Sequence, residues 1–359
     1  MVRKTLAPGI TAALAAALLF GASTPLAKQL LRDTPPMLLA GLLYLGSGVG
    51  LSLARLVRDR GWRVPALERH EWRWLLLAIG FGGVLAPLLL MLGLARTSAA
   101  SASLLLNLEV VFTALLAWIV FRENTDRRVI LGMGLIAAGA VLLGGRNASQ
   151  ALGLGWGSLL IALACLCWAI DNNLTRKVSA SDAVFLAALK GLAAGLANAG
   201  LAVFLGARVP APGVAAQALV VGLLGYGVSL VMFVLALRQL GAARTGAYFS
   251  TAPFVGAAVA VLAFGEHPSH TFWLAGMLMA TGVWLHLKER HRHVHTHRPV
   301  THTHPHVHDE HHPHSHGFDW DGREPHSHAH SHALLTHSHP HYPDVHHQHE
   351  HGGEERATR

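Results

Sequence analysis

Charged residues are scarce in this sequence. Asp, Glu, Lys and Arg together make up 13% of the 359 residues, whereas about a quarter of a typical soluble protein is charged. Cysteine is nearly absent too, and Cys165 and Cys167 both lie inside an apolar run, so no disulfide framework is expected. These shortages argue against a soluble globular domain. The net charge of +8 comes from arginines between apolar runs, so no nucleic-acid partner is expected.

The sequence consists instead of apolar runs of roughly 17–25 residues, the length that a helix needs to cross a bilayer. Short breaks with basic residues or turn formers, such as Thr34-Pro35-Pro36, separate the runs. We interpret the first run as a retained helix rather than a signal peptide, because it matches a later helix. The sequence therefore predicts an all-α polytopic membrane protein with ten transmembrane helices, at 8–28, 37–57, 73–95, 99–121, 129–145, 153–175, 182–205, 214–237, 245–264 and 271–288.

The basic residues are unevenly divided between alternate breaks. With the N-terminus inside, fifteen Lys and Arg fall on the inner side and five on the outer side, before the C-terminal tail is counted. Short cytoplasmic loops collect these residues. An even number of spans then returns the chain to the side where it started. We expect a multi-pass protein of the cytoplasmic (inner) membrane with both termini in the cytoplasm.

One stretch of the chain occurs twice, as Leu92–Glu123 and Val234–Glu266. Each copy has an apolar helix that ends in a basic residue, a turn of small residues, and a second apolar helix that closes on a glutamate. From Ser98 onward the copies register at a constant shift that places Gly139 on Gly282, and the earlier parts of the chain register at a slightly larger shift. Because each repeat has five spans, the second repeat must insert upside down. Inverted repeats are typical of secondary transporters, which hold substrate near the midplane. A scaffold or a membrane enzyme is the alternative, but we see no catalytic constellation and expect no enzyme.

The repeated five-helix unit, with its basic residue before a small-residue turn and its closing acidic residue, resembles the EamA family of the drug/metabolite transporter superfamily. The resemblance covers residues 8–288. It implies ten helices, cytoplasmic termini and alternating access, and many members export amino acids or other small metabolites. The family often has proline midway along its fourth and ninth helices; Pro253 fits, whereas its counterpart here is Val110. We expect a first EamA-like repeat at 1–148, a second at 149–288, and a tail at 289–359.

Polar side chains at membrane depth are costly, and they usually face a cavity or a partner. Asp171, Asn172 and Asn173 offer a carboxylate and two amides to a cation, an ammonium group or a proton. The alternative is a helix end at which Asp171 pairs with Arg176. Lys190 lies in the seventh span, where it would neutralise Asp171 or bind a substrate carboxylate; the alternative is a lysine that reaches out to the interface.

Glu109, beside Asn107, is the deepest carboxylate in the sequence and the candidate for proton coupling. The alternative is that Glu109 forms a structural ion pair, for which Lys190 is one candidate partner. Tyr248 and Phe249 are candidates to line the cavity, with core packing as the alternative. The predicted substrate-binding residues are Glu109, Asn107, Asp171, Asn172, Asn173, Lys190 and Tyr248. Glu123 and Glu266, by contrast, are expected to hold helix ends or loops rather than substrate.

The C-terminal segment from His286 onward contains all but three of the 27 histidines, mostly as His-x-His. Such a segment cannot bury a core, so we predict a disordered tail. Neutral imidazole suits divalent nickel, zinc, cobalt and copper, and the imidazoles titrate near their unperturbed pKa of about 6.5, so mild acid would release metal. The predicted metal ligands are His291, His293, His295, His297, His302, His304, His306, His308, His326, His328, His330 and His332.

Two functions are compatible with this organisation. In the first, the membrane part exports a small, amino-acid-like metabolite and the tail buffers or senses metal. In the second, nickel, cobalt or zinc is the substrate and the tail collects it; this is less expected, because the predicted spans contain no histidine apart from His286 near the cytoplasmic end of the tenth. A metal-responsive signalling protein without transport is a third class. The expected partners are a small-molecule substrate, the lipid bilayer and metal ions on the tail, with a homodimer left open and no cofactor required.

Overall fold

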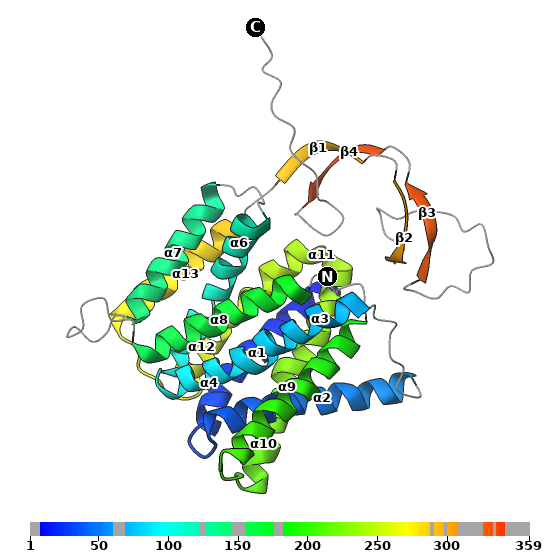
Figure 1. The fold of residues 1–359 in the computed structure, drawn as a ribbon. Helices are drawn as coiled ribbons and strands as arrows, with labels where there is room; N and C mark the ends of the chain where they lie inside the picture. The colour runs from blue at the N-terminus through cyan, green and yellow to red at the C-terminus, as the bar shows by residue number, and fades with distance from the viewer. Residues whose placement is uncertain are drawn as a thin grey trace, which may run out of the picture. The chain divides into compact units, whose positions relative to one another are not determined.

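The computed structural model describes residues 8–59, 69–121, 127–144, 155–175, 182–287, 291–297, 300–306, 326–332 and 335–341. The chain divides into two compact units, Met1–Glu289 and Arg290–Arg359. The described part of the first unit is helical, and the described part of the second consists of short strands (Figure 1).

The helices of the first unit follow one another with short connections. They are α1 (Pro8–Leu30), α2 (Pro36–Asp59), α3 (Arg69–Ala78), α4 (Ala86–Ala95), α5 (Ala99–Leu105), α6 (Leu108–Phe121), α7 (Arg127–Gly144), α8 (Trp156–Thr175), α9 (Ala183–Phe204), α10 (Pro212–Gly222), α11 (Ser229–Phe249), α12 (Ala252–Leu262) and α13 (His270–Leu287), with two π-helical segments, η1 (Ile79–Leu85) and η3 (Leu223–Val228).

Eight helical stretches in the described residues are long and apolar enough to cross a membrane. They coincide with the first eight predicted spans. The ninth predicted span falls on the end of α11 and the shorter apolar helix α12, and the tenth falls on α13. The large apolar side chains at the surface, such as Leu262 and Phe204, fit helices whose outer faces meet lipid. The prediction of an all-α multi-pass membrane protein is confirmed.

The two halves of the bundle pack against each other in corresponding pairs. Helix α2 packs along α9, and α7 packs along α13, as both are seen side by side in Figure 1. The α7–α13 contact is reciprocal: a side chain at Gly139 would meet Met279, and one at Gly282 would meet Ile136. Gly282 and Met279 occupy the positions in the second copy that Gly139 and Ile136 occupy in the first, so each contact repeats the other. This reciprocity follows from the internal repeat.

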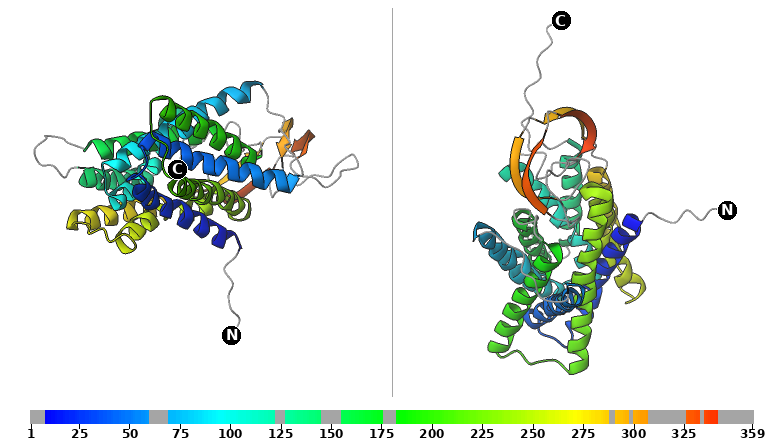
Figure 2. Two further views of the ribbon diagram at one scale, coloured as in Figure 1. Left: turned by 90° about the horizontal axis from the view of Figure 1, so that it is seen from below. Right: turned by 90° about the vertical axis from the view of Figure 1, so that its right-hand side faces the viewer.

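Each half has a π-helical segment in its third span, η1 in the first half and η3 in the second. Both are rich in glycine, with the sequences IGFGGVL and LLGYGV. A π-turn leaves backbone carbonyls without their usual helical partners, and such turns are frequent at functional sites. Figure 2 shows the first unit from two further sides.

The fourth and ninth spans are both interrupted near their middles. The first break separates α5 from α6 at Leu106–Asn107, and the second separates α11 from α12 at Ser250–Thr251. Pro253 stands at the start of α12, as expected. The fourth span has Val110 where the family often has proline, and it is interrupted all the same. Proline is therefore not required for this break.

The halves differ at one corner. Between α4 and α5 the chain turns at Arg96–Ser98, whereas α11 runs without interruption through the corresponding positions 239–241. The second copy of the repeat therefore lacks the turn of small residues that the sequence predicts there. Ala242 and Ala243, with high helix propensity, lie in the continuous helix.

The described part of the tail forms four strands: β1 (His291–His297), β2 (Val300–His306), β3 (His326–His332) and β4 (Leu335–His341). Strand β1 pairs antiparallel with β4, and β2 pairs antiparallel with β3. This differs from the predicted absence of regular structure in these four segments. The alternation of histidine with Val, Thr, Ser and Ala provides the period of two that an extended strand requires.

Candidate functional site

The site is centred on an ion pair between two membrane helices. Lys190, on α9, donates to the Asp171 carboxylate, on α8. The exposed fractions of the two side chains are 21% for Lys190 and 5% for Asp171. The Thr175 hydroxyl, one turn further along α8, donates to the other Asp171 oxygen at 3.0 Å. Burying a charge without a partner is costly, so each member holds the other in this place.

The π-helical segment η1 provides room for the carboxylate. A side chain on Gly82 would overlap the Asp171 carboxylate, so only glycine leaves space there. The Gly82 carbonyl, freed by the π-turn, accepts hydrogen bonds from the Tyr44 hydroxyl at 2.9 Å and from the Trp168 indole at 3.1 Å. Asn198 Nδ2 donates to the Val84 carbonyl at 3.2 Å. Helices α2, α8 and α9 thus all bind the backbone of η1.

A second polar pair lies beside the ion pair. Asn172 Nδ2 donates to Glu109 Oε1 at 2.8 Å. Glu109 also interacts electrostatically with Asp171 and Lys190. It lies in the first turn of α6, directly after the break in the fourth span, and transporters commonly build binding sites from such interrupted helices. We call these two pairs, which neighbouring residues of α8 contribute to, the central cluster: Glu109, Asp171, Asn172 and Lys190.

The first half of the repeat has no carboxylate equivalent to Asp171, which lies in the second half. At the larger shift of the repeat, Ser23 in α1 corresponds to Asp171 in α8, and Gly82 and Gly225 lie in the π-helical segments of the two third spans. A side chain on Gly225 would meet Ser23, just as one on Gly82 would meet Asp171. The same close approach therefore occurs twice, with a hydroxyl in one copy and a carboxylate in the other.

Aromatic rings fill the space beside the central cluster. Tyr226, in η3, packs against Tyr44 at 5.5 Å and against Phe20 at 5.9 Å between ring centroids. Phe249 packs against Phe20 at 5.5 Å and against Phe233 at 4.8 Å. Through Tyr44, this row of rings reaches the Gly82 carbonyl and hence the ion pair. The row joins α1, α2, η3 and α11.

The structure brings some of the predicted site residues together and leaves others apart. Asp171 pairs with Lys190, and Glu109 pairs with Asn172 rather than with Lys190. Asn173 Nδ2 donates to the Ala169 carbonyl of its own helix at 2.8 Å. Asn107 Nδ2 donates to the Leu104 carbonyl, three residues earlier in the chain, at 2.9 Å. The Tyr248 side chain is half-buried. Arg176, the other partner considered for Asp171, lies outside the described residues.

Sequence reasoning missed the contacts to the backbone of η1, which involve Tyr44, Trp168, Gly82 and Asn198. No local sequence pattern indicates a π-turn, so the hydrogen bonds that the Gly82 carbonyl accepts could not be predicted. The sequence offered one signal: the third span of each half is rich in glycine, around Gly82 and around Gly225. Glycine within a membrane helix lets another helix approach closely.

A second polar site holds the corner between α4 and α5. The Glu266 carboxylate accepts hydrogen bonds from the Ala99 and Ala100 amides at 2.8 and 2.9 Å. Ser98 Oγ accepts from the next amide, at Ser101. On the other side of the corner, Lys28 Nζ donates to the Leu94 carbonyl at 2.6 Å. An anion at a helix N-terminus and a cation at a helix C-terminus both oppose the helix dipole favourably, so the two helix ends are capped from elsewhere in the chain.

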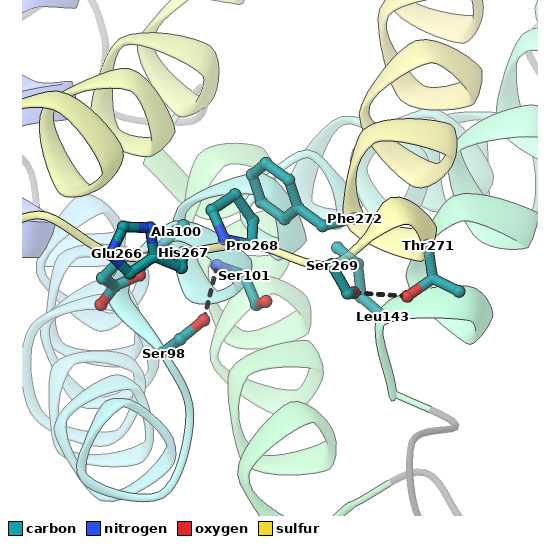
Figure 3. Close-up of a pocket in the computed structure, with 10 residues that line it drawn as sticks. All are labelled: Ser98, Ala100, Ser101, Leu143, Glu266, His267, Pro268, Ser269, Thr271 and Phe272. Carbon is teal, nitrogen blue, oxygen red and sulfur yellow. Dashed lines mark hydrogen bonds between the residues drawn. The ribbon is translucent and has the colours of Figure 1, made fainter.

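A cavity of about 270 Å³ lies beside Glu266. Figure 3 shows its polar rim, where Ser98 accepts from the Ser101 amide and Ser269 hydrogen-bonds Thr271. Its lining shares no residue with the central cluster. Glu266 thus holds a helix end, as the sequence predicts.

Metal ligands do not gather in the part of the bundle that the structure describes, where no group of three or more His, Cys, Asp or Glu side chains is found. Of the predicted tail ligands, His308 lies outside the described residues, and the other eleven lie in β1, β2 and β3. Strand β4 adds three histidines that the predicted set left out, namely His337, His339 and His341.

Comparison with known proteins agrees with this architecture. The EamA-like transporter family matches residues 7–145 and again 155–287. The chain is 29% identical to an uncharacterized transporter of Methanothermobacter thermautotrophicus over 292 residues, 77% of this chain and 85% of the relative. Over 114 residues it is 46% identical to a probable 4-amino-4-deoxy-L-arabinose-phosphoundecaprenol flippase subunit ArnE of Pseudomonas aeruginosa, 30% of this chain and 94% of the relative.

A solved crystal structure superimposes on the chain with a TM-score of 0.58 at 21% identity, covering 77% of this chain and 95% of the other. At that identity the likeness concerns the fold alone. The family match spans both halves of the helical bundle, and the relatives are named as transporters or as a flippase subunit. The chain belongs to the EamA-like transporter family.

Proposed function

We propose that this protein exports a small, amino-acid-like metabolite across the cytoplasmic membrane by alternating access between its two repeats, 1–148 and 149–288. Both termini face the cytoplasm in this proposal, and the tail binds divalent transition metals. The observation that carries the transport proposal is the Asp171–Lys190 pair, which two membrane helices hold against the backbone of η1. Ionisable residues within membrane helices mark substrate and ion pathways.

The charges of the pair match those of a zwitterion. A substrate ammonium would bind Asp171, and a substrate carboxylate would bind Lys190, so an incoming zwitterion replaces each partner with a group of the same sign. Glu109 and Asn172 provide a carboxylate and an amide beside the pair. In the absence of substrate the two charges satisfy each other, which avoids leaving an unpaired charge in the membrane.

The test is counterflow of labelled amino acids into proteoliposomes that contain the purified protein. A panel of neutral, acidic and basic amino acids identifies the substrate. Lys190→Ala should then abolish flux, while Arg32→Ala, which removes a cation outside the central cluster, should leave it unchanged. Full flux in Lys190→Ala, with normal insertion, would remove Lys190 from the site. Absence of flux for the whole panel in the wild type would reject the amino-acid-like substrate.

A second candidate comes from the likeness to the flippase subunit, whose name specifies a lipid-linked amino sugar. Such a substrate has an ammonium group for Asp171, and its anion for Lys190 is a phosphate rather than a carboxylate. The two candidates therefore separate on the cargo itself: movement of a labelled lipid-linked amino sugar in cells that depends on Asp171, without counterflow of any amino acid of the panel, would favour the lipid-linked cargo.

Export of nickel, cobalt or zinc is the alternative. Proteoliposomes with an entrapped metal-sensitive dye test it with each of the three ions. We expect no metal flux, because the described part of the bundle lacks a group of three metal-ligating side chains. Flux that disappears in Asp171→Asn would instead make the metal the cargo.

A further inference from the structure

The histidines of the tail occupy opposed positions in the backbone register of the strands. In the first sheet His291 is opposite His341, His293 is opposite His339, and His295 is opposite His337. In the second sheet three more pairs stand opposite each other: His302 and His330, His304 and His328, and His306 and His326. Only the end positions of the two sheets depart from this pattern among the described strands, with His297 opposite Leu335 and His332 opposite Val300.

Both sheets share one register. The residue numbers of opposed partners add to the same total from His291↔His341 through His306↔His326, so the two separate sheets have the same pairing register. Residues i, i+2 and i+4 of a strand lie on the same face. Each sheet therefore places three histidine pairs on one face, and the positions between them, such as Val294↔Ser338 and Thr303↔Ala329, on the other.

Composition alone does not explain this pairing. An isolated two-stranded ribbon is marginal at best in water, and the tail lacks the apolar residues to build a core. Opposed neutral histidines contribute no more than about 1 kcal/mol per pair, and protonated ones repel each other, because like charges directly across a ladder are destabilising. Something that binds imidazoles in pairs is needed to make this register the favoured one.

A divalent transition metal has the required chemistry. Directly opposed residues have Cβ atoms about 4.5–5.5 Å apart, and neighbouring pairs on one face are about 7 Å apart along the strand. Two neighbouring pairs thus present four histidines within the reach of one ion, which is the ligand number of a tetrahedral zinc site. Metal binding to a chain without a preformed site supplies folding free energy directly.

We infer that the tail folds on divalent transition metal in this one register, with each sheet providing one site of four histidines drawn from two adjacent cross-strand pairs. The inference rests on the proposed metal binding of the tail and specifies its geometry. It also explains why the sequence predicts disorder while the structure has strands: the disordered and paired forms are the metal-free and metal-bound states. The expected capacity is about two tightly bound ions per chain, one for each sheet.

The test compares deletions that keep every histidine. Deletion of Val294 moves His291 and His293 to the opposite face, because a shift of one residue exchanges the faces of a strand. Only one of the three pairs of the first sheet then remains. Deletion of Gly317, in the connection between β2 and β3, shortens the chain equally and leaves both registers intact. The full-length protein in detergent is titrated with zinc against a chromogenic chelator, and X-ray absorption counts the imidazole ligands.

We expect about two tight zinc ions for the wild type and for the Gly317 deletion, and about one for the Val294 deletion, each with four nitrogen ligands. Equal capacity in all three proteins, with ligand numbers that vary with zinc loading, would overturn the fixed register and leave an adaptable metal-binding chain. Absence of tight zinc in the wild type itself would overturn the metal-binding role of the tail as well. Neither outcome bears on transport by the bundle.

Discussion

At the scale of single residues, glycine in η1 decides whether the ion pair forms. The Gly82 position is in contact with the Asp171 carboxylate, whereas the nearby Gly80 has open space where a side chain would stand. Both lie in the same π-helical segment, so they have the same backbone environment. They therefore form a matched pair for testing the importance of close approach.

We expect Gly82→Ala to displace Asp171 from Lys190 and to lower flux at least tenfold, while Gly80→Ala leaves flux within twofold of the wild type. A methyl group at position 82 occupies the volume of the carboxylate, and overpacking costs about 1–3 kcal/mol. Counterflow in proteoliposomes provides the rates. Equal rates for the two variants would show that the approach of η1 to Asp171 does not matter for transport.

Glu266 caps the N-terminus of α5. Glu266→Gln removes the negative charge and one of the two acceptors at the N-terminus of α5, which is worth about 0.5–2 kcal/mol for a helix cap. Hydrogen exchange of the amides of Ala99 and Ala100 should accelerate by about tenfold. Ser269→Ala, in the same loop, is the control, because the Ser269 hydroxyl bonds Thr271 and not the corner. Unchanged exchange in Glu266→Gln would mean that water replaces the carboxylate without loss.

At the scale of helices, α8 and α9 are joined by opposite charges. Asp171→Asn alone leaves Lys190 without its partner, and breaking a buried pair costs about 3–5 kcal/mol. Combining it with Lys190→Met removes both charges. We expect the double variant to survive heating in detergent much better than either single variant, as measured by the folded fraction on size exclusion, and still not to transport. A double variant as unstable as the singles would show that other contacts cause the loss.

The break between α5 and α6 places Glu109 among several titratable groups. Asp171 and Lys190 interact with it, and the buried Cys165 thiol lies against the Leu105 carbonyl at the same break. If Glu109 carries the coupling proton, Glu109→Gln should flatten the pH dependence of flux while some flux remains. Asn107→Ala, at the same break, should keep the wild-type profile. A wild-type profile in Glu109→Gln would exclude the proton role.

At the scale of the whole molecule, the bundle and the tail are separate compact units. A chain that ends after Glu289 should insert and transport like the full-length protein, and it should bind no zinc in the tight range. Transport flux and zinc binding are both measured on the full-length protein and on the truncated protein. Loss of flux on truncation would show that the tail contributes to transport.

Much of the molecule follows from its sequence because the relevant signals are local or repeated. The apolar runs predict the helices, and the register of the internal repeat, with Gly139 on Gly282, accounts for the paired packing of α7 with α13. The pairing of Lys190 with Asp171 was among the predicted alternatives, since few other charges lie at that depth. The Tyr44 contact to the Gly82 carbonyl was not predictable, because it depends on a π-turn that no local pattern indicates. The straight course of α11 was missed because its first-half counterpart turns.

The Asp171–Lys190 pair has a consequence for the membrane potential. Moving one elementary charge through the full field costs about 2.3 kcal/mol per 100 mV. A pair of opposite charges that moves together has no net charge, so the field does little net work on it, whether or not a zwitterion has taken its place. Glu109 pairs with an uncharged amide and has no such compensation. Any voltage dependence of flux should therefore come through Glu109 and the proton or cation that accompanies it.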